Sequence, residues 1–141
     1  MESTLDTLTV LREYMAGWNA HDVTRAARCL AAEVEYHDAT VGEPQRGMEA
    51  ARDNVITFFL EALPDLTWTM VGEPLVADGS AAFRWVFAGT NTGRPFEGDA
   101  PTGASIELQG MSLVQVEKGK IVYQGDFYDA LTLRRQLGLP G

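Results

Sequence analysis

The stretch LTWTMVGEPLVADGSAAFRWVFAGT, residues 66–90, decides the fold class. It contains two long segments of strand-forming residues, Leu66 to Val76 and Ala81 to Thr90, with Asp78-Gly79 between them. Asp-Gly between two such segments is a strong signal for a β-hairpin. The second segment repeats large rings at a spacing of two, which places them on one face of the strand: Phe83, Trp85 and Phe87.

The chain after this hairpin predicts two more strands and a terminal helix. A Gly- and Pro-rich segment, residues 93–103, leads into a strand from Ser105 to Glu117. The turn Lys118-Gly119 then joins it to a strand from Ile121 to Phe127. The apolar spacing from Leu131 to Leu137 predicts a short helix.

The chain before the hairpin is mostly helical. Apolar residues recur at three-and-four spacing from Leu5 to Trp18, which predicts an amphipathic helix. Asp22 is placed to cap a second helix that runs to about Ala31. A strand from Val34 to Ala39 follows, and a third helix from Met48 to Leu63 ends at Pro64.

This order separates helices from strands and predicts one α+β domain over residues 1–141. We expect a curved antiparallel sheet, covered by helices, around an apolar pocket that carries the function. The later strands are apolar on both faces, so a second copy of the chain should cover the outer face. A homodimer is therefore predicted.

Composition excludes several classes of function. The chain has 11 Lys and Arg against 20 Asp and Glu, for a net charge of -9, which disfavours nucleic acid and anionic membranes. One cysteine, Cys29, allows no internal disulfide, and no signal peptide or membrane span is evident. We expect a cytoplasmic protein. Two histidines, His21 and His37, are too few for a zinc site, and no cofactor motif occurs, so neither metal nor cofactor is predicted.

Six short segments together resemble a known family. They are residues 14–22 (YMAGWNAHD), 89–93 (GTNTG), 101–103 (PTG), 119–122 (GKIV), 126–129 (DFYD) and 136–138 (QLG). In this order they resemble the SnoaL-like polyketide cyclases of the nuclear-transport-factor-2-like superfamily, over nearly the whole chain. The resemblance implies a cystatin-like α+β cone and a small-molecule pocket. It also implies an aspartate base that closes a ring by intramolecular aldol addition without a cofactor.

Asp126 is the first candidate for that base, because it matches the aspartate near the end of the last strand in SnoaL-like proteins and in the related epoxide hydrolases. A carboxyl group enclosed by apolar side chains has a raised pKa, as a general base requires. The alternative is that Asp126 or Asp129 caps the terminal helix. For Asp129, which immediately precedes the helical pattern, capping is favoured.

Tyr14 and Asp38 form a second candidate pair, which resembles the proton donor and the proton-transferring aspartate of the ketosteroid isomerases. The acid that completes the isomerase oxyanion hole would fall near Met111, which cannot donate a hydrogen bond, so that mechanism is disfavoured. His37 is a titratable neighbour and a further candidate acid or base. It points to the opposite face of the strand from Asp38 unless the strand bends.

The epoxide-hydrolase resemblance is partial, because Arg84 matches its arginine while Val86 stands where its second acid would be. Arg84 either orients a substrate carbonyl or pairs with a carboxylate such as Asp126. The side chains that could line a pocket for a flat polycyclic ligand, or simply form core, are Trp18, Trp68, Trp85, Phe87 and Met111.

The sequence therefore predicts a cofactor-independent cyclase or isomerase, acting by acid–base chemistry on a small apolar, polyketide-like carbonyl compound. Asp126 is the expected base, with Tyr14, Asp38 or His37 as proton donors. Two alternatives remain at this point. One is an isomerase-like proton shuttle through Tyr14 and Asp38, and the other is a protein that binds an apolar ligand without turnover.

Overall fold

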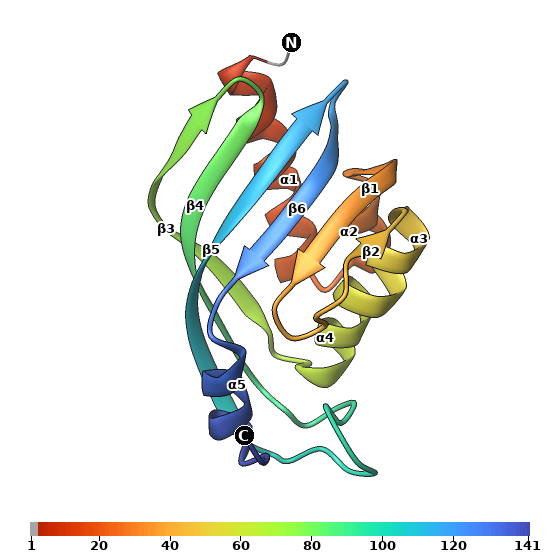
Figure 1. Cartoon of the computed structure of the whole chain (residues 1–141), viewed down its shortest axis with the longest axis vertical. Coiled ribbons are helices and arrows are strands. Elements are labelled where there is room, and N and C mark those ends of the chain that lie inside the picture. The colour runs from red at the N-terminus through yellow and green to blue at the C-terminus, as the bar shows by residue number, and fades with distance from the viewer. Residues whose placement is uncertain (1–2) are drawn as a thin grey trace.

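The computed structural model describes residues 3–141 and contains one six-stranded sheet in the order β2-β1-β6-β5-β4-β3 (Figure 1). The strands are β1 (Leu30–Asp38), β2 (Gln45–Arg46), β3 (Thr67–Ala77), β4 (Ser80–Thr90), β5 (Ser105–Glu117) and β6 (Lys120–Phe127). The helices are α1 (Thr4–Asn19), α2 (Val23–Ala27), α3 (Met48–Ala51), α4 (Thr57–Ala62) and α5 (Ala130–Leu137), with a π-helical segment η1 (Arg52–Ile56) between α3 and α4. The α+β class and the four long strands are confirmed.

The sheet departs from the expected antiparallel pattern at one place. β1 pairs with β6 in parallel, whereas the other neighbouring strands are antiparallel. The parallel pair places the end of β1 next to the end of β6, and both ends carry an aspartate. This edge positions the candidate site.

The predicted second helix is too long. α2 ends at Ala27, and β1 begins at Leu30, because the Cys29 carbonyl accepts a hydrogen bond from the Ile121 amide and so starts the pairing with β6. The third predicted helix is continuous in space but changes to a π-helical turn over Arg52–Ile56. Such wide turns often occur near functional sites.

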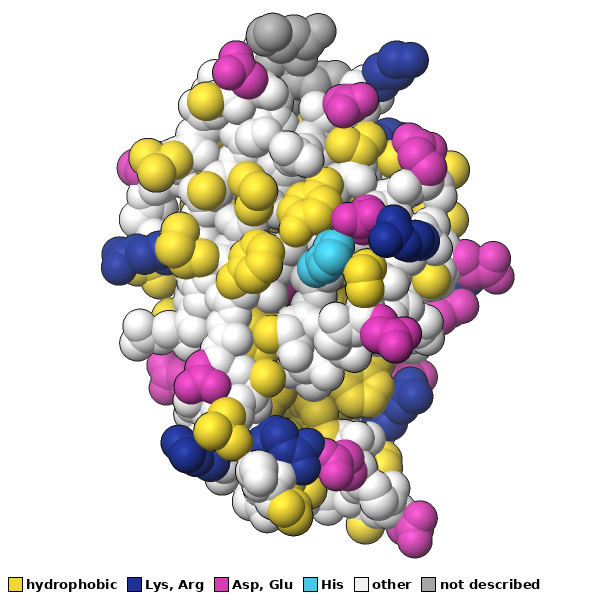
Figure 2. Space-filling model, viewed as in Figure 1, with side chains coloured by type: hydrophobic (Ala, Val, Ile, Leu, Met, Phe, Trp, Pro, Cys, Tyr) yellow, Lys and Arg dark blue, Asp and Glu magenta, His cyan; other side chains and the backbone are white. Residues whose placement is uncertain are grey.

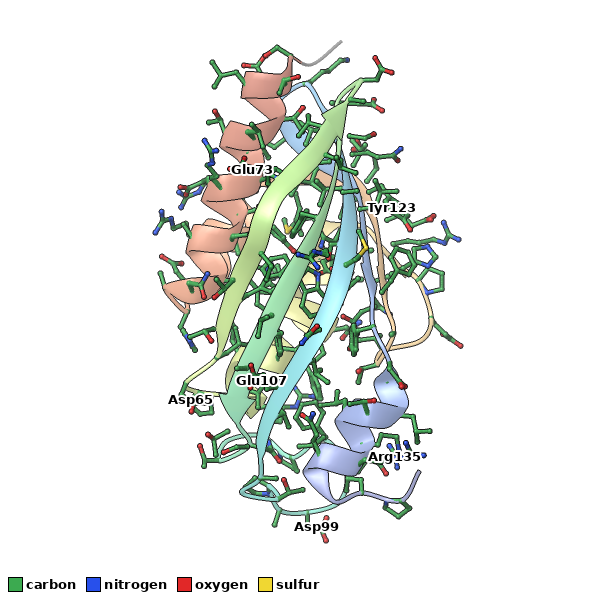
Figure 3. All side chains as sticks on the ribbon, turned by 90° about the vertical axis from the view of Figure 1, so that its left-hand side faces the viewer. Asp65, Glu73, Asp99, Glu107, Tyr123 and Arg135 are labelled. Carbon is green, nitrogen blue, oxygen red and sulfur yellow. The ribbon has the colours of Figure 1, made fainter. Side chains whose placement is uncertain are left out.

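Most of the helices lie on one side of the sheet, whereas α5 lies against the end of β5 on the opposite side from α1. α1 and α2 lie behind the strands in Figure 1, and the α3–α4 segment stands beside β1 and β2. Figure 3 shows α1 running along the sheet with side chains filling the space between them. The interior is rich in aromatic rings at edge-to-face or tilted angles: Tyr14, Trp18, Phe59, Trp68, Phe83, Trp85 and Phe87. Such pairs add to the stability gained from burial of the rings.

Apart from α5 at one end, no helix among residues 3–141 covers the other face of the sheet. Figure 2 shows hydrophobic side chains scattered over this face, between charged ones at its edges. Met111 is 45% exposed and Phe127 is 54% exposed. Arg84 pairs in register with Met111 and is also exposed on this face. No helix in residues 3–141 is long and apolar enough to cross a membrane.

Candidate functional site

Two buried carboxyl groups lie side by side at the ends of β1 and β6. Asp38 and Asp126 are in register across the parallel pair, and only 5% and 8% of their surfaces are exposed. Side chains alternate along a strand, so Tyr36 and Asp38 of β1 point inward together, as do Gln124 and Asp126 of β6. The parallel register therefore brings two acids from distant parts of the sequence to one interior position.

Asp126 accepts hydrogen bonds from three neutral side chains. The Tyr36 hydroxyl donates to Oδ2 at 2.6 Å, and Ser112 Oγ and Gln124 Nε2 each donate to Oδ1 at 2.6 Å. Ser112 itself accepts from the Trp85 indole N–H at 2.8 Å, so its own proton is directed to Asp126. Three donors around one carboxyl group favour its ionised form.

Asp38 is held on one oxygen. Its Oδ1 accepts from the Tyr128 hydroxyl and from the Thr40 backbone N–H, both at 2.8 Å. The Thr40 side-chain hydroxyl is in turn hydrogen-bonded to the Tyr128 hydroxyl. Asp38 thus has fewer side-chain donors than Asp126, and its carboxyl group also interacts with that of Asp126.

Burial raises the pKa of both carboxyl groups above the ordinary range. Burial, followed by the negative charge of Asp126, raises the pKa of Asp38 to about 8. Burial also raises the pKa of Asp126, while the donors Ser112, Tyr36 and Gln124 oppose that rise. Because two close carboxylates rarely ionise together, the pair holds one proton near neutral pH. The hydrogen bonds place that proton on Asp38 and the charge on Asp126.

The acid pair faces a narrow inner pocket of about 20 Å³. Its lining is predominantly aromatic: Trp18, Tyr36, Asp38, Phe59, Trp68, Trp85, Phe87, Leu108, Asp126 and Tyr128. The chain has three tryptophans, and all of them are in this lining. A space of this size admits a water molecule or one compact group.

A larger outer groove of about 350 Å³ lies nearby, between the β1–β2 loop, η1–α4, the 91–104 loop and α5. Its lining includes Thr40, Val41, Phe58, Phe96, Leu133 and Leu137. Figure 2 shows a recess with hydrophobic side chains in this region, open to solvent. Thr40 lines the outer groove and Tyr128 lines the inner pocket, so the hydrogen bond between their hydroxyls joins the linings of the two spaces.

The structure brings six of the sequence-predicted site residues to the inner pocket. They are Asp38, Asp126, Trp18, Trp68, Trp85 and Phe87. Asp129 instead caps α5, as favoured from the sequence, by accepting hydrogen bonds from the Leu131 and Thr132 amides.

The other predicted residues lie elsewhere. Arg84 and Met111 point to the outer face, because their strand positions alternate with the inward Trp85 and Ser112, so neither lines the pocket and Arg84 does not reach Asp126. His37 also faces outward, where it is hydrogen-bonded to Glu35 at 2.8 Å. It packs against Tyr123, which Figure 3 shows on the side of the sheet opposite α1.

Tyr14 lies behind residues of the pocket and does not line the pocket itself. It is fully buried beside Trp18 and Trp68 and is not part of the pocket lining. Its hydroxyl and the Trp18 indole N–H have no hydrogen-bond partner among residues 3–141. An unpaired buried donor costs about 1–3 kcal/mol, so these two groups are available to a ligand oxygen or to water.

Sequence reasoning missed the polar side chains that support the acids: Tyr36, Thr40, Ser112, Gln124 and Tyr128. Tyr36 and Gln124 each precede an aspartate by two residues, and that spacing was a usable signal. Ser112 had none, because only the β5–β6 register places it opposite Asp126. No group of three or more His, Cys, Asp or Glu that could hold a metal ion occurs in the described part of the chain.

Comparison with known proteins agrees with this architecture. Residues 8–137 match the family of SnoaL-like polyketide cyclases. TsrD from Streptomyces laurentii superposes with a TM-score of 0.82 at 24% identity, covering 99% of this chain and 100% of that one. IdmH from Streptomyces antibioticus, a candidate polyketide cyclase, gives 0.76 at 25% identity, with 94% and 99% covered.

A protein with a ketosteroid isomerase-like fold from Catenulispora acidiphila, solved with trimethylamine, gives a TM-score of 0.76 at 18% identity, with 93% of each chain covered. No curated protein sequence matches the chain. The structural neighbours share the fold, and the family match spans most of the sequence. The chain therefore belongs to the SnoaL-like polyketide cyclase family.

Proposed function

We propose that the chain catalyses ring closure or a related isomerisation of a small, apolar, polyketide-like carbonyl compound by acid–base chemistry, without a cofactor. The observation that carries this proposal is the Asp38–Asp126 pair, in which a protonated and an ionised carboxyl group lie together in an aromatic pocket. One group can give a proton while its neighbour takes one. That combination is what an aldol-type reaction needs.

In an intramolecular aldol step Asp126 removes a proton from the carbon between two carbonyl groups. That carbon then forms a bond to a second carbonyl carbon of the same molecule, and Asp38 delivers its proton to the oxygen of that carbonyl. One proton is taken up and one is released, so the charge of the pair is unchanged. Proton transfer between the adjacent carboxyl groups restores the starting state.

Unpaired donors support the same reaction. Trp18 lines the inner pocket, and its indole N–H has no partner among the described residues, so a substrate oxygen that reaches it can accept its hydrogen bond. A donor aimed at developing negative charge lowers the barrier most in a site that excludes water. Tyr14, which packs edge-on against Trp18, is a second candidate donor if a ligand oxygen reaches deeper.

The outer groove offers the space that the inner pocket lacks. At about 350 Å³ it falls within the usual range of ligand pockets. Its apolar side chains suit the body of a polyketide-like molecule, and Asn54, Glu97 and Arg134 add polar groups to its lining. For the reacting carbon to reach Asp126, the Tyr128 side chain must move away from Thr40. We therefore expect substrate binding to break the hydrogen bond between these two residues.

We also propose that two copies pair through the outer sheet face. Met111, Phe127 and Val71 expose between 37% and 54% of their surface there, which is costly in water.

The buried free thiol of Cys29 fits a reducing compartment such as the cytoplasm.

The test is turnover of a panel of linear polyketide esters, fused-ring ketones and epoxides by the purified protein and by Asp126→Asn. Loss of the base should lower kcat by about 10²- to 10⁴-fold. Asp53→Asn is the matched control, because Asp53 is exposed and lines neither the inner pocket nor the outer groove. Unchanged turnover in Asp126→Asn would refute the assignment. A larger loss in Asp38→Asn than in Asp126→Asn would favour the isomerase-like shuttle, and binding without turnover would favour a binding protein.

A further inference from the structure

A groove of about 240 Å³ lies between α1, the end of α2 and the β5–β6 turn. It is lined by Thr9, Val10, Glu13, Arg25, Arg28, Cys29, Gly119 and Lys120. Cys29 directly precedes β1, whereas Asp38 ends it, and a strand of nine residues is about 26 Å long. The groove is therefore separate from the site that holds the acid pair.

The groove gathers positive charge on an acidic chain. Within residues 3–141, its lining contains three of the 11 Lys and Arg of the chain but one of the 20 Asp and Glu. The local excess is thus two positive charges, whereas the whole chain carries a net charge of -9. A hollow that carries the opposite charge to its surroundings concentrates anions from solution.

The charges of the groove act on one common point, the Cys29 thiol. Burial, followed by the charge of Glu13, raises the pKa of this thiol. The three cations, Lys120, Arg25 and Arg28, oppose that rise. Because all three influence the same buried side chain and line the same groove, one anion can interact with all of them.

Each of the three cations keeps donors that the protein does not use. Nε and Nη2 of Arg25 donate to the Glu13 carboxylate at 2.7 and 3.0 Å, which leaves Nη1. Lys120 Nζ donates to the Arg28 carbonyl at 2.5 Å and has two further protons. The exposed Arg28 guanidinium makes no hydrogen bond or ion pair within residues 3–141. Arg and Lys donors of this kind are the groups with which proteins bind phosphate.

The size and the charge of the groove restrict the ligand. A space of about 240 Å³ accommodates a phosphate group together with a small organic substituent. A phosphate monoester carries about 1.5 to 2 negative charges at pH 7, which matches the local excess of two positive charges. A long polyanion would extend beyond the groove over a chain whose net charge of -9 repels it.

We propose that this groove binds the phosphate monoester of a small molecule between Arg28, Lys120 and Arg25. Glu13 limits the affinity, because it occupies two donors of Arg25 and repels the anion. The site lies about one strand length from the acid pair, so its ligand takes no part in the proposed ring closure.

The test is a titration of ¹⁵N-labelled protein at pH 8 with glycerol 2-phosphate and, separately, with inorganic phosphate, followed by NMR. We expect saturable shifts of the backbone amides in the groove, with glycerol 2-phosphate binding at least as tightly as inorganic phosphate. Sodium chloride and sodium acetate at the same ionic strength are the controls and should give no saturable shift. Binding of inorganic phosphate alone would refute the monoester and leave a site for the free anion.

Three single-charge variants separate a site from general attraction. Arg28→Gln should raise the Kd by about threefold or more, and Glu13→Gln should lower it by a similar factor, because one removes a cation beside the anion and the other an acid. Arg135→Gln is the matched control. It also removes one exposed guanidinium, but from α5, at the opposite end of the molecule from the β5–β6 turn (Figure 1).

Three results would overturn the proposal: no saturable shift, an equal loss of affinity in Arg28→Gln and Arg135→Gln, or weaker binding in Glu13→Gln. Equal losses would mean that phosphate responds only to the total charge of the chain. Since no turnover is measured, failure of this site is separate from failure of the proposed ring closure.

Discussion

Asp38→Asn should make the protein more stable at neutral pH, although it removes a proposed functional group. Asparagine has nearly the same shape, and its Oδ1 can still accept from the Tyr128 hydroxyl and the Thr40 amide. The substitution removes only the free-energy cost of burying an ionisable group beside Asp126. Active-site groups often carry such a cost in stability.

The magnitude follows from the pKa of Asp38, which rises from an ordinary 3.8 to about 8 on folding. Between these values the folded chain keeps a proton that the unfolded chain has released, so the free energy of unfolding falls as pH rises. Each pH unit costs about 1.4 kcal/mol. At pH 7 the variant should therefore be more stable than the wild type by about 4 kcal/mol, and the difference should vanish near pH 4.

The assay is urea unfolding of both proteins at several pH values between 4 and 8. The exposed Asp53→Asn is the control: Arg52 lowers the pKa of Asp53, so this variant should show no stabilisation that grows with pH. A difference between Asp38→Asn and the wild type that stays constant across this range would refute the reasoning, because it would mean that Asp38 is ionised normally in the folded protein.

Three other predictions follow from the same geometry. Turnover should show a bell-shaped pH dependence: it should fall above about pH 8, where Asp38 loses its proton, and in acid, where Asp126 gains one. A rate that keeps rising beyond pH 9 would contradict this prediction. Tyr36→Phe removes a donor to Asp126, so the acidic limb should move to higher pH in a pH–rate measurement, and an unmoved limb would argue against Asp126 as the base. Met111→Glu should convert a dimer to a monomer in sedimentation, whereas Leu5→Glu on exposed α1 should not, and a wild-type monomer at micromolar concentration would remove the dimer proposal.

Local pattern was enough for most of the elements. The strand from Ser105 to Glu117 has the predicted bounds, and the hairpin turns at Asp78-Gly79 as expected. These features depend on residue spacing and turn chemistry, which are local properties of the chain. The second helix was overestimated because Leu30 pairs with Ile121, from a strand at the far end of the sequence, and that pairing outweighs helix propensity.

The same contrast between local pattern and long-range pairing applies to the candidate site. The sequence by itself determined that Asp38 lies in the first strand, that Asp126 lies near the end of the last strand, and that large rings share one face of a strand, because alternation along a strand requires only the strand itself. Which acids meet was decided by the tertiary structure. The parallel register of β1 and β6 sets Asp38 beside Asp126, and the β5–β6 register brings Ser112 to the pair. Burial inside the cone then raises their pKa values, since an acidity depends on the solvent and the charges around a group and not on its neighbours in sequence.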